Sequence, residues 1–183
     1  MFTRIVIGPC LIGAILWTLR DHATSGEPPP AATPVAELQR LASSVGVWNT
    51  AQRFRPTPGA SPFESTSTEK VRWSDSKQYL ISEQRGLTPT GWTSKVLVTS
   101  WNPTDHQIHV VEVSLGGFTT ELTLWFEGDV QKILGYRRFG ERLVRTELTV
   151  EHTSPDEYKF HSDCTDQGKT WVCSEGISKR VKK

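Results

Sequence analysis

The stretch Leu41-Ala-Ser-Ser-Val-Gly-Val-Trp48 decides how this chain folds. It ends a short amphipathic segment and leads through a Gly-x-Trp into a long series of alternating segments. After Trp48, apolar residues recur at every second position, and Gly, Pro, Asn and Asp separate one segment from the next. No later stretch has a helical period of any length. The pattern therefore predicts an antiparallel β-barrel that is entered through a short helix.

The alternating segments amount to roughly ten strands joined by short turns. Closing such strands into an up-and-down barrel removes the exposed edges of an open sheet, so an all-β barrel is favoured over a two-sheet sandwich. A helix over 34–43, with Val35, Leu38 and Leu41 on one face, is expected to plug one end. The strands are expected over 46–56, 63–74, 78–85, 94–101, 107–114, 118–127, 130–137, 141–152, 157–165 and 170–180.

Length and charge restrict the class of protein. A chain of 183 residues with 36% hydrophobic content can bury one core as a single domain. The 21 basic and 20 acidic side chains are interspersed, so no extended field attracts nucleic acid or an anionic membrane. The sequence therefore predicts neither a nucleic-acid-binding protein nor a protein held at a membrane surface by its charge.

The first residues have the pattern of an export signal. A short basic start precedes an apolar run over 5–19, which is brief for a membrane span, and small residues follow at 23–25. We expect a signal peptide over 1–25, with an uncleaved anchor as the alternative, and a Pro-rich spacer over 26–36 before a barrel domain at 37–183. Lipidation of Cys10 is disfavoured because Pro9 precedes it. The protein is thus predicted to be exported, to the periplasm or the cell exterior.

The other two cysteines agree with export. A two-residue turn at Gly168-Lys169 would place Cys164 opposite Cys173 on adjacent strands, where a disulfide can form. Such a bond persists in an oxidising compartment. Two separate buried thiols are the alternative.

A second hairpin, around Pro155, fixes which residues face inward. An even register pairs Val150 with Phe160, Leu148 with Ser162 and Glu151 with Lys159, whereas a slip by one residue would turn the core face outward. The hairpin at Gly168-Lys169 independently places Trp171, Cys173 and Ile177 inside, with Phe160 opposite Ile177, so the two hairpins agree. Alternation elsewhere predicts an inner face of Trp48, Gln52, Phe54, Val71, Trp73, Val111, Val113, Phe118, Leu122, Leu124, Phe126, Leu134, Tyr136, Val144 and Leu148.

Three polar residues are also predicted to face inward, because each lies two positions from an inward apolar residue on its strand. They are Glu69, His109 and Glu175. A buried charge requires a partner or water, so these side chains either line a wet cavity, meet one of the arginines between 137 and 145, or lie at the solvated rims. No Cys/His spacing resembles a metal site, and no nucleophile elbow or phosphate loop is present. The sequence gives no metal, haem or other cofactor site, and an enzyme is less favoured than a binding protein.

Six tryptophans in the predicted domain are a stronger indication of function. Trp48 and Trp73 fit a core, but Trp92 lies in a stretch rich in turn residues, where it could gate a barrel mouth or make a peripheral packing contact. Trp125, which alternates with Leu124 and Phe126, is expected to point outward and could anchor a protein partner.

The stretch 41–48, the segments Glu69–Trp73 and Tyr79–Glu83, the turn Trp101–Asp105 and the closing residues 169–180 together resemble a bacterial family of exported proteins, domain of unknown function 1579. The resemblance covers roughly residues 37–181 and implies a calycin-like barrel related to lipocalins, fatty-acid-binding proteins and nitrobindin. In lipocalins, the tryptophan of the Gly-x-Trp packs against an arginine from the last strand. Gly46 and Trp48 match the first part, and Arg180 is the candidate for the second. The family implies no established activity, and the predicted register of His152 and His161 does not support a nitrobindin-like haem ligand.

Together these patterns favour an exported, noncatalytic barrel that binds a small, largely apolar ligand. A module with a packed core and a protein partner is the alternative, and an enzyme of unknown type is third. A cavity of at least about 300 Å³ would favour the first hypothesis. The candidate ligand-binding residues, inside the barrel or at its mouth, are Trp73, Trp92, Glu69, His109, Phe126, Tyr136 and Glu175.

Overall fold

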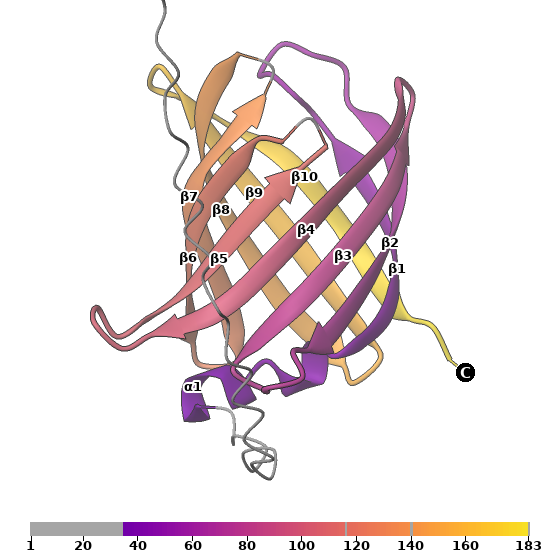
Figure 1. Ribbon diagram of the computed structural model, residues 1–183. Coiled ribbons are helices and arrows are strands. Elements are labelled where there is room, and N and C mark those ends of the chain that lie inside the picture. Colours follow the sequence, from indigo (N-terminus) through magenta and orange to yellow (C-terminus); the bar gives the residue numbers. More distant parts are fainter. Residues whose placement is uncertain (1–34, 116, 140, 183) are drawn as a thin grey trace, which may run out of the picture.

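The computed structural model describes residues 35–115, 117–139 and 141–182, which form a closed barrel of ten antiparallel strands (Figure 1). Each strand pairs with its neighbours in sequence, and β1 pairs with β10 to close the barrel. The predicted up-and-down barrel is therefore confirmed, and the sandwich is excluded. The predicted signal peptide, the spacer up to residue 34 and Cys10 lie outside the described residues.

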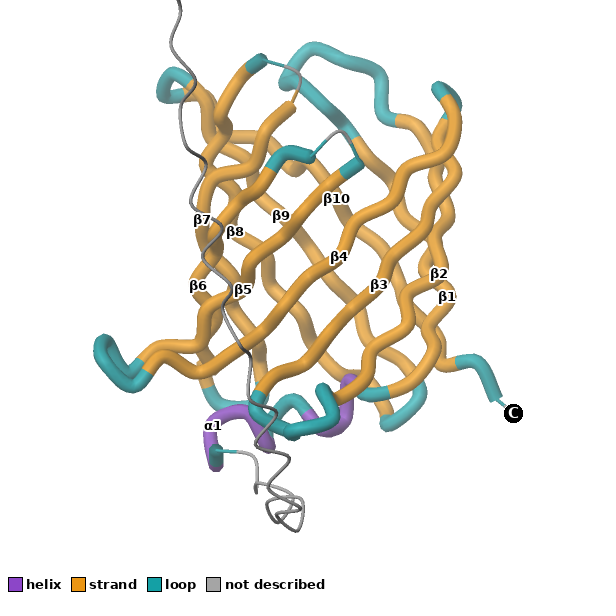
Figure 2. Tube along the Cα trace, in the orientation of Figure 1, coloured by secondary structure: helices purple, strands orange, loops and turns teal. Residues whose placement is uncertain are grey.

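The strands follow the predicted segments within a few residues. In that part of the chain they are β1 (Gly46–Phe54), β2 (Phe63–Trp73), β3 (Tyr79–Thr88), β4 (Gly91–Asn102), β5 (Gln107–Ser114), β6 (Thr119–Glu127), β7 (Val130–Phe139), β8 (Arg142–Ser154), β9 (Glu157–Asp166) and β10 (Lys169–Arg180). Figure 2 shows the strands inclined to the barrel axis, with the helical residues gathered at one end and loops joining the strands at both ends.

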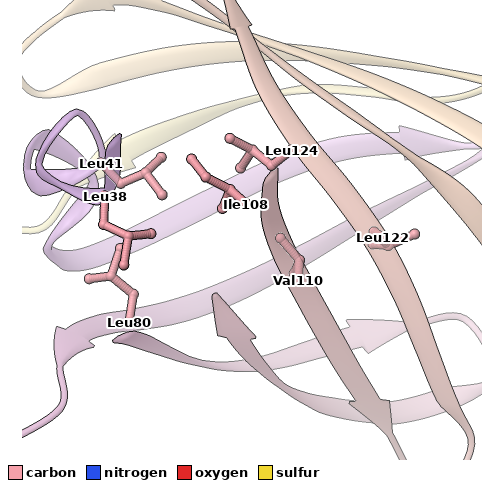
Figure 3. Close-up of a cluster of buried hydrophobic side chains, with 7 residues drawn as sticks. All are labelled: Leu38, Leu41, Leu80, Ile108, Val110, Leu122 and Leu124. Carbon is pink, nitrogen blue, oxygen red and sulfur yellow. The ribbon is translucent and has the colours of Figure 1, made fainter. Parts of the chain in front are cut away.

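The helical residues close one end of the barrel. The predicted helix is shorter than expected, because the α-helix α1 spans only Ala36–Gln39 and a 3₁₀ turn, η1, follows over Ala42–Ser44. Leu38 and Leu41 are buried, and Figure 3 shows them facing leucine and isoleucine side chains of the strands. The buried cluster at this closed end consists of Leu38, Leu41, Leu80, Ile108, Val110, Leu122 and Leu124.

The register predicted for the β8–β9 hairpin is confirmed. Val150 pairs with Phe160, and Glu151 pairs with Lys159, as alternation requires. The β9–β10 hairpin differs from its prediction. Its turn is centred on Gln167 and Gly168, with φ values of 48° and 76°, which are those of a type I′ turn. Cys164 therefore lies opposite Trp171 rather than Cys173.

A β-bulge at Cys173 nevertheless brings the two cysteines together. The register shifts between Val172 and Ser174, so Cys173 is an extra residue on its strand. It forms a disulfide with Cys164 across a Cα–Cα distance of 5.6 Å, as predicted. Beyond the bulge the two faces of β10 exchange. Phe160 consequently pairs with Gly176, and Ile177 is 39% exposed on the outer face, contrary to prediction.

Two other strands have the opposite phase from the one predicted. On β5, Ile108 and Val110 face inward because they pair with Leu124 and Leu122, which leaves Val113 exposed. This strand has apolar residues on both faces, so alternation alone did not fix its orientation.

On β7, Ile133 and Gly135 face the interior in place of Leu134 and Tyr136. A Cβ at Gly135 would lie 2.8 Å from the carbonyl oxygen of Glu121, so the close approach of β6 requires glycine there.

Within the described ranges, none of the helices has the length and apolar content needed to cross a membrane.

Candidate functional site

The interior of the barrel encloses a cavity of about 400 Å³, and it extends from the helical plug to the opposite end. Every strand contributes inward side chains to it. Most of the wall is apolar, and Phe118, which is 51% exposed, lies with Arg138 and Phe139 at the end away from the plug, here called the mouth. The apolar side chains that line it are Leu41, Trp48, Phe54, Val71, Leu80, Leu97, Val110, Phe118, Leu122, Leu124, Ile133, Phe139, Leu148, Val150 and Phe160.

The Gly-x-Trp stretch seals the cavity at the plug. Trp48 is fully buried, its Nε1–H donates to the Ser44 carbonyl at 2.8 Å, and the Arg180 guanidinium lies 4.3 Å from its ring centroid. Arg180 also donates to the carbonyls of Ser43 at 2.6 Å and Val45 at 2.5 Å. The lipocalin-like contact implied by the resemblance is therefore present. The guanidinium holds together the plug and both closing strands.

A polar group of side chains lies on the cavity wall near the plug. Tyr158 donates to Glu69 Oε2 at 3.3 Å, and Ser82 donates to the other carboxylate oxygen. Burial, together with the Glu69 charge, raises the pKa of Tyr158, so this hydroxyl keeps its proton. The ring of His152 lies 5.5 Å from that of Tyr158 and 6.4 Å from that of Trp48. Burial first, and then the Arg180 charge, lowers the pKa of His152 and favours its neutral form.

A second polar group lies further toward the mouth, around the buried carboxylate of Glu112. Lys95 Nζ is 3.1 Å and Arg137 Nη2 is 3.4 Å from Glu112 Oε2, and Ser114 donates to Oε1 at 3.3 Å. Burial by itself would raise the pKa of Glu112, but the two cations outweigh it and lower this pKa to about 2. The cavity thus contains a carboxylate that stays charged and is held between two cations.

The sequence-predicted site residues divide between the two faces of the barrel. Glu69 lines the cavity, and Trp73 and Phe126 pack against the cluster at the closed end, where Arg40 lies over the Phe126 ring at 3.9 Å. Trp92 is not in a loop at the mouth. It is the second residue of β4, and it is 72% exposed on the outer face beside Leu87.

The inward orientation predicted for three residues is wrong. His109 lies outside, where Asp105 and Glu121 each approach its ring nitrogens at 2.7 Å, because Val110 takes the inner position. Tyr136 is 53% exposed since β7 has the opposite phase. Glu175 points outward because the bulge at Cys173 exchanges the faces of β10.

Sequence reasoning missed several polar residues that the cavity contains, among them Lys95, Glu112, His152 and Tyr158, and it named Arg137 only as one of several arginines that could meet a buried carboxylate. The alternation of Ile108, Val110 and Glu112 on one face of β5 was the available signal, but the competing apolar face at 111 and 113 obscured it. Among the described residues, no three His, Cys, Asp or Glu side chains are grouped as a metal site requires.

The fold is shared with solved structures. Rv2717c from M. tuberculosis matches with a TM-score of 0.61 and 15% sequence identity, over 82% of this chain and 100% of that chain. The S-type phycobiliprotein lyase CPES from Guillardia theta matches with a TM-score of 0.53 and 17% identity, over 79% of this chain and 92% of that chain. At such identities the likeness shows the fold alone. The fold and the cavity define the class of this protein, a calycin-like β-barrel.

No family model matches the sequence, and no curated protein matches it. Membership of the domain of unknown function 1579 family therefore stays a prediction.

Proposed function

We propose that this protein is a noncatalytic binding protein that holds a small, largely apolar molecule inside its barrel. The observation that carries the proposal is the cavity of about 400 Å³, which lies in the range of known ligand pockets. Its wall combines apolar side chains, which give most of its area, with fixed polar groups, among them Glu69 and Glu112. Such a combination gains free energy by burying an apolar ligand and orients that ligand through few polar contacts.

The same cavity argues against the alternative hypothesis, a packed module that acts through its outer surface. A solid core would bring inward side chains from opposite strands into contact, at the density of other protein interiors. Here the apolar cluster lies beside the plug, and a cavity of about 400 Å³ is present inside the barrel.

The disulfide supports the further proposal that the protein works after export. A bond between Cys164 and Cys173 persists in the periplasm or outside the cell and is uncommon in a reducing cytosol. The expected ligand is therefore one that occurs in an exported compartment.

Calorimetric titration of the protein with a fatty acid, with a retinoid-like polyene and with haem tests the binding function. We expect heat of binding with at least one apolar ligand, and no binding to any of the three would overturn the proposal. To locate the site, Leu97→Trp places a large ring inside the cavity and should abolish binding. Val96→Trp is the matched control, because Val96 is 42% exposed on the outer face of the same strand. Equal affinities in both variants would exclude the cavity as the site.

A further inference from the structure

In the group around Glu112, the positive charges outnumber the single negative charge of the carboxylate. Lys95 and Arg137 both lie within 3.4 Å of the same oxygen, Oε2, so one carboxylate faces two cations. A third cation, Arg138, lines the mouth with its guanidinium 5.2 Å from the Phe118 ring centroid. The carboxylate remains charged throughout the physiological range, since the two neighbouring cations lower its pKa to about 2. A net positive charge is therefore left on the cavity wall.

One hydrogen-bond donor in this group has no acceptor. The Nε–H of Arg137 is buried and meets no partner among the described residues, although the Nη2 atom of the same guanidinium approaches Glu112. A buried charged donor without an acceptor costs more than an ordinary lost hydrogen bond, and a guanidinium can hold an oxyanion through two parallel donors. Arg137 thus lines the cavity. Its Nη2 atom approaches Glu112, and its Nε–H has no hydrogen-bond acceptor among the described residues.

The rest of the cavity indicates where the two ends of a ligand would lie. Toward the plug the wall combines leucine, isoleucine and valine side chains with the polar group around Tyr158, and the carboxylate of Glu69 in that group would repel an anion. His152, on the same part of the wall, is held toward its neutral form and does not offset that charge. A ligand with one negative end and an apolar body would therefore place the negative end beside Arg137 and the body toward the plug.

We propose that the ligand is an amphiphile with a carboxylate head group, and that Arg137 and Lys95 bind this head group beside Glu112. The proposal rests on the proposed binding function and adds the chemical class of the ligand. Glu112 serves as an internal counter-ion that keeps both cations fixed, and an incoming carboxylate satisfies the remaining Arg137 donor and the uncompensated charge.

The test compares a long-chain fatty acid with its methyl ester, which has the same chain but no charge. We expect the native protein to bind the acid about tenfold to a hundredfold more tightly than the ester, as charged hydrogen bonds predict. Absence of binding by both compounds would overturn the carboxylate assignment, and the binding function itself would be refuted only if the polyene and haem also failed to bind. Equal affinity for both would leave that function intact and overturn the carboxylate assignment.

Variants then locate the head group. Arg137→Met should reduce affinity for the acid to about that for the ester, while Glu112 keeps Lys95 as its partner. Arg145→Met is the matched control, because Arg145 is an arginine on β8 that is 44% exposed and pairs with Glu147. Glu112→Gln releases both cations and should strengthen acid binding, which keeps the proposal testable even if the Arg137 variant fails to fold. Unchanged discrimination between acid and ester in the folded variants would overturn it.

Discussion

Single residues fix the closed end of the barrel. Arg180 pairs with Trp48 in the β1–β10 register, and its guanidinium stacks on the indole while donating to the carbonyls of Ser43 and Val45. It also donates to the Pro155 carbonyl at 3.0 Å in the β8–β9 turn. One side chain therefore connects the plug, the first and last strands and a neighbouring turn.

Trp48→Ala is expected to destabilise the protein by about 3–5 kcal/mol, because it removes a fully buried aromatic side chain. Arg180→Ala should cost about 1–3 kcal/mol through the loss of charged hydrogen bonds and of the cation–π contact. The double variant should lose less than the sum of the two, since both changes remove one contact. Thermal or denaturant unfolding of all three variants measures this coupling, and strict additivity would contradict it.

The backbone and surroundings of Gly46 explain why the Gly-x-Trp motif begins with glycine. Its φ of 149° is unfavourable for other residues, and a Cβ there would collide with the Arg180 guanidinium. We expect Gly46→Ala to reduce the free energy of unfolding by about 1–3 kcal/mol. Gly59→Ala is the matched control, since a Cβ at Gly59 meets nothing within 4 Å. Denaturant unfolding compares the two, and equal stability would show that the Arg180 contact does not require glycine.

The lowered pKa of Glu112 predicts that the free energy of unfolding decreases in acid. Its pKa is lowered from 4.5 to about 2 in the folded protein, so its contribution is fully present above about pH 4.5 and is lost as the pH falls toward 2. The shift corresponds to about 3 kcal/mol. Glu112→Gln lacks this group, so the stability difference between the native protein and this variant should shrink as the pH falls through that window. Urea unfolding at a series of pH values measures it, and a constant difference would refute the assignment.

At the scale of elements, the bulged β9–β10 hairpin combines the disulfide with a change of face. The bulge lets both cysteines lie inside, beside Trp171 and Val144, and turns the following residues of β10 over. It thereby places Ser178 inside, where its hydroxyl lies 2.6 Å from that of Thr50 on β1.

Replacing Cys164 and Cys173 together by serine should lower stability by about 2–3 kcal/mol in the chain-entropy model, because the disulfide closes a loop between residues only nine apart in sequence. Thermal melting with and without a reducing agent tests this. The native protein should melt at a lower temperature when reduced, whereas the double variant should not respond. Labelling of both Cys164 and Cys173 in the unfolded, unreduced native protein would refute the bond.

At the scale of the whole molecule, closure depends on the pairing of β1 with β10. These strands lie at opposite ends of the described chain, so their contacts form only after a long loop has been closed. We expect refolding on the millisecond-to-second scale typical of all-β proteins. Stopped-flow tryptophan fluorescence from denaturant measures it, and refolding within microseconds would contradict the dependence on this closure.

The sequence by itself determined the architecture of this protein. Period-two alternation and turn residues are local properties, and so the ten strands, the plug and the pairing of Val150 with Phe160 could be predicted. The Gly-x-Trp stretch likewise led to the contact with Arg180 through a resemblance, and the close cysteines led to the disulfide.

The tertiary structure alone decided which face of the ambiguous strands lies inside, and hence what the cavity contains. On β5 both faces are apolar, and cross-strand pairing with Leu122 and Leu124 turned Glu112 inward. On β10 a single bulge turned Glu175 outward. Both outcomes depend on the free energy of the contacts between neighbouring strands. The cationic group around Glu112 therefore becomes visible only once the pairing of β4 to β7 brings Lys95 and Arg137 to Glu112.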